Sequence, residues 1–122
     1  MTVYVDDARI PARIGRYDTR WSHLFADTPA QLHRFAARLG LQRRWFQDPT
    51  KVGKPLAKPG SRAAENWHYD VTDAKRKQAI SLGAVEVTWR EAVGIITARY
   101  ELKRQETLDI LDSGIGKDAA DH

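Results

Sequence analysis

The chain has 122 residues, a mass of 13.9 kDa and no cysteine. This length fits one domain with a single modest core, and the lack of cysteine excludes disulfides, zinc–thiolate sites and thiol nucleophiles. No apolar run approaches the roughly 20 residues that span a bilayer, and the first residues do not form a signal-peptide pattern. We therefore expect a soluble cytoplasmic protein that does not bind membranes.

The net charge is +4, and the positive excess lies in one segment. Residues 34–62 hold eight Lys or Arg and one acidic residue, Asp48, which gives this segment a charge of +7. Such a segment attracts partners that carry phosphate groups. A solvated loop beside a charged helix face explains the same excess, so both interpretations stay open.

Strands are predicted at residues 2–6 and 21–26, where apolar residues run or alternate. The segment between them, residues 8–20, contains four arginines, Pro11 and Gly15. Because proline and glycine interrupt regular elements, we expect an irregular, arginine-rich loop there.

A first helix is predicted from Thr28 as N-cap to Gly40 as the stop signal. Pro29 suits the first helical position, and Gln31 completes a capping-box spacing. A strand at residues 43–47 follows. The next segment, residues 48–66, is rich in proline and glycine and is predicted as a basic loop.

The second half of the chain again predicts strands that alternate with helices. It predicts a strand at 68–71, a helix capped by Thr72 or Asp73, a strand at 84–89 and a third helix from about Arg90 to Leu111. The order predicts an α/β fold, with one small domain over residues 1–112, a mixed and partly parallel sheet of about four or five strands, and about three helices. The polar second half of the last helix is expected to project or to form a homo-oligomer, and residues 113–122 to form a disordered tail.

Three carboxylates follow predicted strands and form a candidate metal site. Asp6, Asp27 and Asp70 each lie at a strand end, where ligands collect in partly parallel sheets. Carboxylate oxygens are the ligands of Mg²⁺ and Mn²⁺. Asp7 is adjacent to Asp6 and would point to the opposite face, so only one of the two is expected to bind the ion, and the other to cap a turn.

Two histidines are candidate catalytic residues. His23 and His68 lie in strand-like segments, and either could position or deprotonate an attacking water because imidazole titrates near neutral pH. Hydrogen bonding to the backbone is the alternative role for both. His33, inside the first helix, is interpreted as structural.

Candidate phosphate-binding residues lie in the basic segment, in the strand predicted at 68–71 and at the start of the second helix: Arg43, Arg44, Tyr69, Lys75 and Arg76. An anion near Lys75 and Arg76 would also benefit from the helix dipole. A solvated helix face is the alternative.

No Walker loop, dinucleotide fingerprint, zincin motif or nucleophile elbow is present. Two hypotheses therefore remain. The first is an enzyme, a divalent-metal-dependent phosphoesterase or nuclease. The second is a non-catalytic module that binds a nucleotide, a nucleic acid or a host protein.

Several sequence blocks resemble one family. They are VYVDD at 3–7, WSHL at 21–24, ADTP at 26–29, LHRFAARLGL at 32–41, WFQ at 45–47, HYDVT at 68–72 and AISLGA at 79–84. Together they are similar to the domain-of-unknown-function family number 4031, whose members are short proteins of actinobacteria and of their phages. The resemblance implies a bacterial cytosol as the location, or that of the host if a phage encodes the chain. It marks as motif positions Asp6, Asp7, Trp21, His23, Asp27, Trp45, His68 and Asp70.

Overall fold

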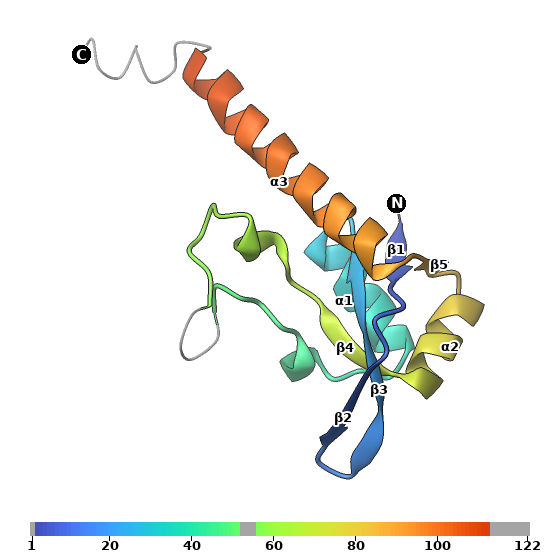
Figure 1. The fold of residues 1–122 in the computed structure, drawn as a ribbon. Helices are drawn as coiled ribbons and strands as arrows, with labels where there is room; N and C mark the ends of the chain where they lie inside the picture. Colours follow the sequence, from blue (N-terminus) through green and yellow to red (C-terminus); the bar gives the residue numbers. More distant parts are fainter. Residues whose placement is uncertain (1, 52–55, 113–122) are drawn as a thin grey trace.

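The computed structural model describes residues 2–51 and 56–112, which form a five-stranded mixed sheet with three α-helices (Figure 1). The strands are β1 (Val3–Val5), β2 (Ile10–Ile14), β3 (Tyr17–Ala26), β4 (Tyr69–Thr72) and β5 (Val85–Glu86). The helices are α1 (Pro29–Arg38), α2 (Asp73–Ser81) and α3 (Trp89–Asp112), with short 3-10 turns η1 (Arg43–Trp45) and η2 (Ala63–Glu65). The predicted α/β fold is confirmed.

The long strand β3 organises the sheet. The strand order is β2-β3-β1-β5, and β4 pairs with the other edge of β3. Only β1 and β5 run parallel, whereas β3 is antiparallel to β1, β2 and β4. This antiparallel centre decides which strand ends lie together.

The prediction of an irregular loop over residues 8–20 was wrong. Ile10–Ile14 forms β2, which pairs in a hairpin with the first half of β3, and Gly15 turns the chain with φ of 59°. Pro11 is compatible with this strand because β2 is an edge strand, where a missing N–H breaks no ladder bond on the open side.

The end signals of α1 and α2 are confirmed. Thr28 Oγ1 accepts a hydrogen bond from the Gln31 N–H at 3.3 Å, and Thr72 Oγ1 accepts one from the Lys75 N–H at 3.2 Å. Gly40 follows α1 with φ of 80°, a conformation that costs glycine little.

Two predicted strands are shorter than expected. Residues 43–45 form the turn η1 instead of a strand, and only Gln47 makes a bridge, to His68. The strand predicted at 84–89 is reduced to β5, because Thr88 and Glu91 cap α3. The Glu91 carboxylate accepts from the Thr88 N–H at 3.0 Å and the Thr88 hydroxyl accepts from the Glu91 N–H at 3.1 Å.

The two faces of the sheet are covered unequally. Leu24, Tyr69 and Val71 point to one face and pack with α1 and α2 in the main core. Phe25 points to the other face, where it packs with Val87 and with Ala92 of α3. Figure 1 shows α1 behind β3 and α2 to the right of the sheet, while α3 crosses only the upper end of the sheet. We call this second face the open face.

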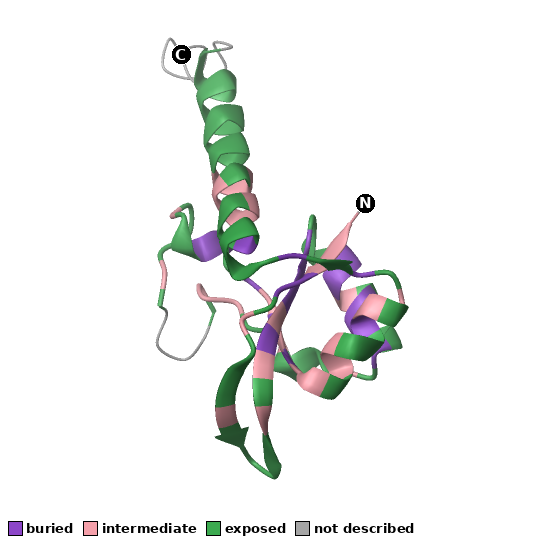
Figure 2. Cartoon of the chain, turned by 45° about the vertical axis from the view of Figure 1, so that its right-hand side comes forward, coloured by how far each residue is buried: buried purple, intermediate pink, exposed green. Residues whose placement is uncertain are grey.

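The distal half of α3 projects from the body, as its polar sequence predicted, and residues 101–112 are exposed throughout (Figure 2). Arg99 holds the proximal half: its guanidinium lies 4.1 Å from the Trp67 ring centroid and donates to the carbonyls of Glu65 and Ala26. No described helix has both the length and the apolar character needed to cross a membrane. The predicted tail at 113–122 and residues 52–55 of the predicted loop lie outside the described residues.

Candidate metal centre

The pairing of β3 with β4 gathers both candidate histidines and one candidate carboxylate. His23 is the cross-strand partner of Asp70 in this antiparallel pair. His68 lies two residues before Asp70, and residues two apart in an extended chain point to the same side. All three side chains therefore lie on the open face.

We call His23, His68 and Asp70 the imidazole–carboxylate cluster. One ligand atom from each residue lies within 4.8 Å of those of the other two. The two imidazole rings are perpendicular, with centroids 4.8 Å apart. In the described part of the chain, this is the group of His and acidic residues close enough to share a metal ion.

Hydrogen bonds fix the orientation of both rings. Nδ1 of His23 donates to Oδ2 of Asp6 at 2.7 Å, and Nδ1 of His68 donates to the Asn66 carbonyl at 2.9 Å. A carboxylate and a carbonyl can only accept a hydrogen bond, so Nδ1 of each ring must carry the proton. Nε2 of each neutral ring therefore carries a lone pair. A metal-binding imidazole has this arrangement, with its second nitrogen donating to a carboxylate or carbonyl.

The contact between His68 and Asp70 calls for a positive charge. Nε2 of His68 lies 3.2 Å from Oδ1 of Asp70. With Nδ1 as the donor, a neutral ring would place two acceptors face to face, which repel each other. A cation between the two atoms removes this repulsion. A cation about 2.1 Å from each would hold them at roughly 100°, within the range of tetrahedral and octahedral coordination.

Asp6 supports His23 from behind. Asp6 is only 3% exposed. Its carboxylate accepts hydrogen bonds from the His23 N–H at 2.9 Å, from the Ala8 N–H at 3.2 Å and from the His23 ring. These bonds form where the chain leaves β1 before β2. Arg9 in this stretch has a strained φ of 44°, as is common beside functional sites.

The Asp6–His23 contact shifts both groups toward their charged forms. The hydrogen bond to Asp6 raises the pKa of His23 above its ordinary 6.5, overcoming the effect of burial, and the charges of Asp6 and Asp70 add to it. Burial acts to raise the pKa of Asp6, but hydrogen bonds from the His23 ring and backbone outweigh it and lower that pKa below 3.8.

Asp70 is also held as a carboxylate. Burial acts to raise its pKa, yet the close contact with the His68 imidazole, together with the charge of His23, lowers the pKa below the ordinary 3.8. The ligand oxygen of the cluster is therefore ionised at neutral pH.

The structure does not bring Asp27 to the cluster. Its carboxylate accepts from the Thr2 N–H and the Tyr4 hydroxyl, both at 2.9 Å. Because β1 and β3 are antiparallel, the end of β1 meets the middle of β3, and Asp27 lies about 13 Å along β3 from His23. Asp7 accepts from the Trp89 N–H at 2.8 Å, at the start of α3, whereas the N–H of the following turn, that of Ala8, bonds to Asp6.

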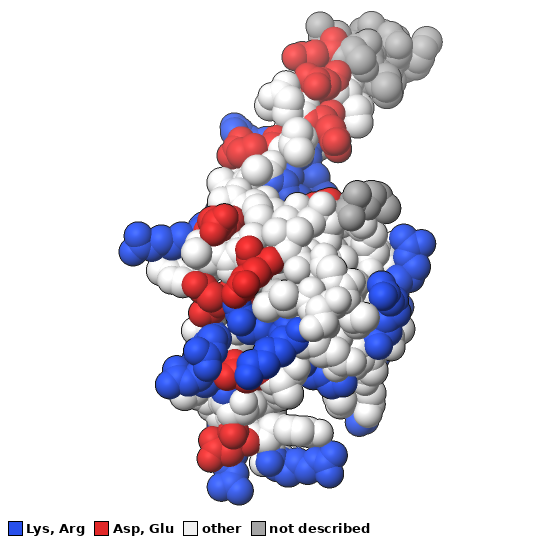
Figure 3. Space-filling model, turned by 90° about the vertical axis from the view of Figure 1, so that its right-hand side faces the viewer, with Lys and Arg blue, Asp and Glu red and all other residues white. Residues whose placement is uncertain are grey.

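The expected phosphate-binding residues lie elsewhere. Lys75 donates to the Leu39 carbonyl, and Arg76 donates to the Asp6 carbonyl at 2.8 Å and contacts Glu86 at 2.6 Å. Figure 3 shows Lys and Arg interspersed with acidic side chains over the middle of the face that it presents.

The other three candidates belong to the opposite side of the sheet. Tyr69 is buried in the main core, and its hydroxyl contacts Nδ1 of His33 at 2.8 Å. Burial raises the pKa of Tyr69, and the positive charge of nearby Arg43 offsets only part of this rise. Arg43 and Arg44 line a separate hollow that shares no residue with the cleft described next.

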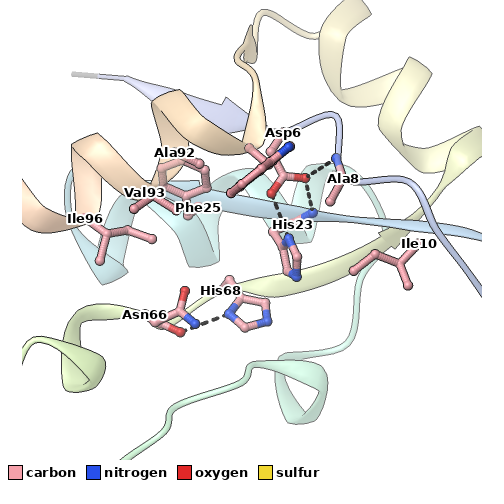
Figure 4. Close-up of a pocket in the computed structure, with 11 residues that line it drawn as sticks. Asp6, Ala8, Ile10, His23, Phe25, Asn66, His68, Ala92, Val93 and Ile96 are labelled. Atoms are coloured by element: carbon pink, nitrogen blue, oxygen red, sulfur yellow. Dashed lines mark hydrogen bonds and ion pairs between the residues drawn. The ribbon is translucent and has the colours of Figure 1, made fainter.

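A cleft of about 420 Å³ opens between the open face and the proximal half of α3 (Figure 4). Asp6, His23, His68 and Asn66 form its polar part, and the remaining lining is apolar: Ala8, Ile10, Phe25, Trp89, Ala92, Val93 and Ile96. Among the described residues, no lysine or arginine lines this cleft. Since His23 and His68 both line it, an ion bound by the cluster would face the cleft.

Sequence reasoning missed Asn66 and the α3 wall of this cleft. Asn66 lies in a segment predicted as loop, and its carbonyl matters only because it fixes the His68 ring. Val93 and Ile96 lie in the third helix that the sequence predicts, and apolar residues at helical spacing do not tell a core face from a cleft wall.

Fold and site define a small α/β protein with a candidate metal centre on a partly covered sheet face. The chain belongs to the family described as "Protein of unknown function (DUF4031)", which matches residues 3–99. This confirms the resemblance, and the match includes the whole imidazole–carboxylate cluster. Comparison with curated proteins and with solved structures finds no match.

Proposed function

We propose that this protein is a divalent-metal-dependent phosphoesterase whose metal is held by His23, His68 and Asp70. One observation carries the proposal. His23, His68 and an ionised Asp70 carboxylate converge on the open face, and both Nδ1 atoms are hydrogen-bonded, so each ring in its neutral form offers Nε2 to an ion. That is the arrangement of histidine ligands with their supporting shell.

The ligand set favours a transition metal. The sequence suggested Mg²⁺ or Mn²⁺ on three carboxylates, but two of the three clustered ligands are imidazoles. Imidazole suits Zn²⁺, Fe²⁺ and Mn²⁺ better than Mg²⁺, which prefers an all-oxygen shell. We therefore propose Zn²⁺, Mn²⁺ or Fe²⁺ and no role for Asp27 as a ligand.

Three protein ligands leave coordination positions for water and for a phosphate oxygen. A bound divalent ion lowers the pKa of its water and neutralises charge on the phosphoryl group. In the reaction, the water oxygen bonds to phosphorus while the bond from phosphorus to the ester oxygen breaks. The released alcohol keeps that oxygen and gains a proton, so one water is consumed for each phosphate formed.

Within this proposal Asp6 is a positioning residue. It holds the proton of His23 on Nδ1 and so keeps Nε2 available for the ion. His23 and His68 are then metal ligands rather than proton-transfer groups.

Thermal unfolding in EDTA, and then with Zn²⁺, Mn²⁺ or Mg²⁺, tests the metal site. A metal at 100 times its Kd stabilises the folded state by about 2.7 kcal/mol, a rise in Tm on the order of 10 °C at this chain length. We expect this rise with Zn²⁺ or Mn²⁺ in the wild type and in Asp18→Asn, which removes an exposed carboxylate of β3. Asp70→Asn, which removes the same charge from the cluster, should abolish it.

Turnover of small phosphate esters by the metal-loaded protein tests catalysis. We expect hydrolysis that EDTA stops and that His68→Gln reduces at least about a hundredfold, as loss of a metal ligand or its support does. His33→Gln is the matched control, since His33 lies on the other face beside Tyr69. Metal binding without any turnover would instead favour a non-catalytic binding module.

A further inference from the structure

The cleft beside the cluster has a composition that restricts what it can hold. Its apolar wall includes side chains that water reaches, with Ile10 52%, Trp89 53% and Val93 43% exposed. Exposed apolar surface next to convergent polar groups is typical of a ligand site. Figure 4 shows Val93 and Ile96 on one side of the two histidines and Ile10 on the other.

The charge of the lining excludes highly anionic ligands. Among the described residues no lysine or arginine lines the cleft, and Lys75 and Arg76 are engaged with the Leu39 carbonyl and with Glu86. A triphosphate or a polynucleotide needs several cations along its phosphates. One divalent ion on the cluster offsets the charge of one phosphoryl group.

The size of the cleft and one polar group with free donors also favour a small phosphate-bearing ligand. A volume of about 420 Å³ lies within the range of small-molecule sites. The side-chain amide of Asn66 lines the cleft beside His68 and makes no hydrogen bond within the described residues, so its N–H groups can donate to a phosphoryl oxygen.

We infer that the substrate is a small phosphate monoester whose organic part carries a flat, uncharged ring, the class that includes nucleoside monophosphates. The phosphoryl group would bind at the cluster and Asn66, and the ring would lie against Trp89 and Val93 of α3. Trp89 lines the cleft, and the Arg90 guanidinium lies 5.4 Å from the centroid of its ring. This inference rests on the proposed metal site and narrows its substrate.

Calorimetry on the full-length, Mn²⁺-loaded protein tests this inference. The probes are a nucleoside 5′-monophosphate, glycerol 3-phosphate, a nucleoside triphosphate and a single-stranded oligonucleotide. The first two are both esters of primary alcohols and differ in the ring. We expect the monophosphate to bind at least about tenfold more tightly than glycerol phosphate, because stacking of one ring supplies that much affinity. The triphosphate and the oligonucleotide should bind no better than the monophosphate.

Substitutions on α3 locate the ring. Trp89→Ala and Val93→Asp should each bring the preference for the nucleoside monophosphate over glycerol phosphate to within about threefold, while the Mn²⁺-induced rise in Tm stays. Leu102→Ala is the control, because Leu102 lies on the projecting half of α3 and is 65% exposed. It should leave the preference unchanged.

The outcomes separate this inference from the proposed function. Equal binding of both monoesters to a protein that binds Mn²⁺ and hydrolyses them would overturn the inference and leave the phosphoesterase standing. Selective binding of the nucleoside monophosphate without turnover would support the inference and overturn catalysis. Tighter binding of the oligonucleotide than of the monophosphate would contradict the inference directly.

Discussion

Asp6 and His23 show how one buried carboxylate serves both the fold and the site. Asp6 takes the place of a missing backbone partner where the chain leaves β1, accepting from the His23 N–H, and the same carboxylate holds the His23 ring. An ionised acceptor makes these hydrogen bonds stronger than neutral ones. Because the carboxylate is buried, removing its charge affects both stability and the direction of Nε2.

We expect Asp6→Asn to be less stable than the wild type, by an amount that depends on pH. The comparison is made in EDTA so that no bound ion contributes to stability. The pKa of His23 is raised in the fold, so its contribution is full below about 6.5 and is lost as pH rises through the higher folded value. The pKa of Asp6 is lowered, so its contribution is full above about 3.8 and is lost as pH falls through the lower folded value. The deficit should therefore be greatest between about pH 4 and 6.5.

Urea unfolding of wild type and variant across this range measures the deficit. We expect about 1–3 kcal/mol near pH 5, the cost of weakening a buried hydrogen bond between charged groups, and a smaller deficit near pH 9. The absence of a deficit would mean that Asp6 acts only through its backbone hydrogen bonds, which an asparagine oxygen can also accept. A deficit that is constant with pH would contradict a role for the charged Asp6–His23 contact.

For individual residues, the sequence predicted which side chains belong to the site better than it predicted which of them lie close together. Asp6, His23, His68 and Asp70 were recognised because acids and imidazoles flank apolar strand segments. Their grouping required the register of β3 with β4, which no residue pattern reveals. Asp27 has the same local signature, yet the antiparallel β1–β3 pair places it far from the others.

At the scale of elements, end signals were the most reliable part of the sequence. Thr28 and Thr72 cap their helices as predicted, because side-chain caps act within a few residues. The hairpin of β2 and β3 differs from the predicted loop, because pairing with β3 outweighs the local preferences of Pro11 and Gly15. An edge strand accepts that proline without losing a ladder bond on its open side.

The adjacent acids Asp6 and Asp7 give a prediction at this scale. Asp7 accepts from the Trp89 N–H at the start of α3 and does not belong to the cluster. We expect Asp7→Ala to lose about 0.5–2 kcal/mol of stability, the usual cost of a lost helix cap, and to keep the full rise in Tm with Zn²⁺ or Mn²⁺. Loss of the metal response in Asp7→Ala would identify Asp7 as a ligand and overturn the assignment made here.

For the whole molecule, unequal coverage of the sheet is the feature that creates the site. Two helices bury one face, and α3 covers only part of the other, which leaves the cluster at the edge of a cleft. The family match ends at residue 99, the position of the arginine that fastens α3 to the body. The proximal half of α3 therefore belongs to the shared domain, and the projecting half lies beyond it.

In the proposed site, Nε2 of His23, Nε2 of His68 and the Asp70 carboxylate bind one divalent ion. Nitrogen-15 NMR of the imidazole rings during titration with Zn²⁺ tests it most directly, because each ring nitrogen reports its own protonation and metal binding. We predict that Nε2 of His23 and His68 shift together and saturate at one equivalent, that both Nδ1 atoms stay protonated, and that His33 does not respond. Unchanged His23 and His68 resonances, or binding through Nδ1, would contradict the account.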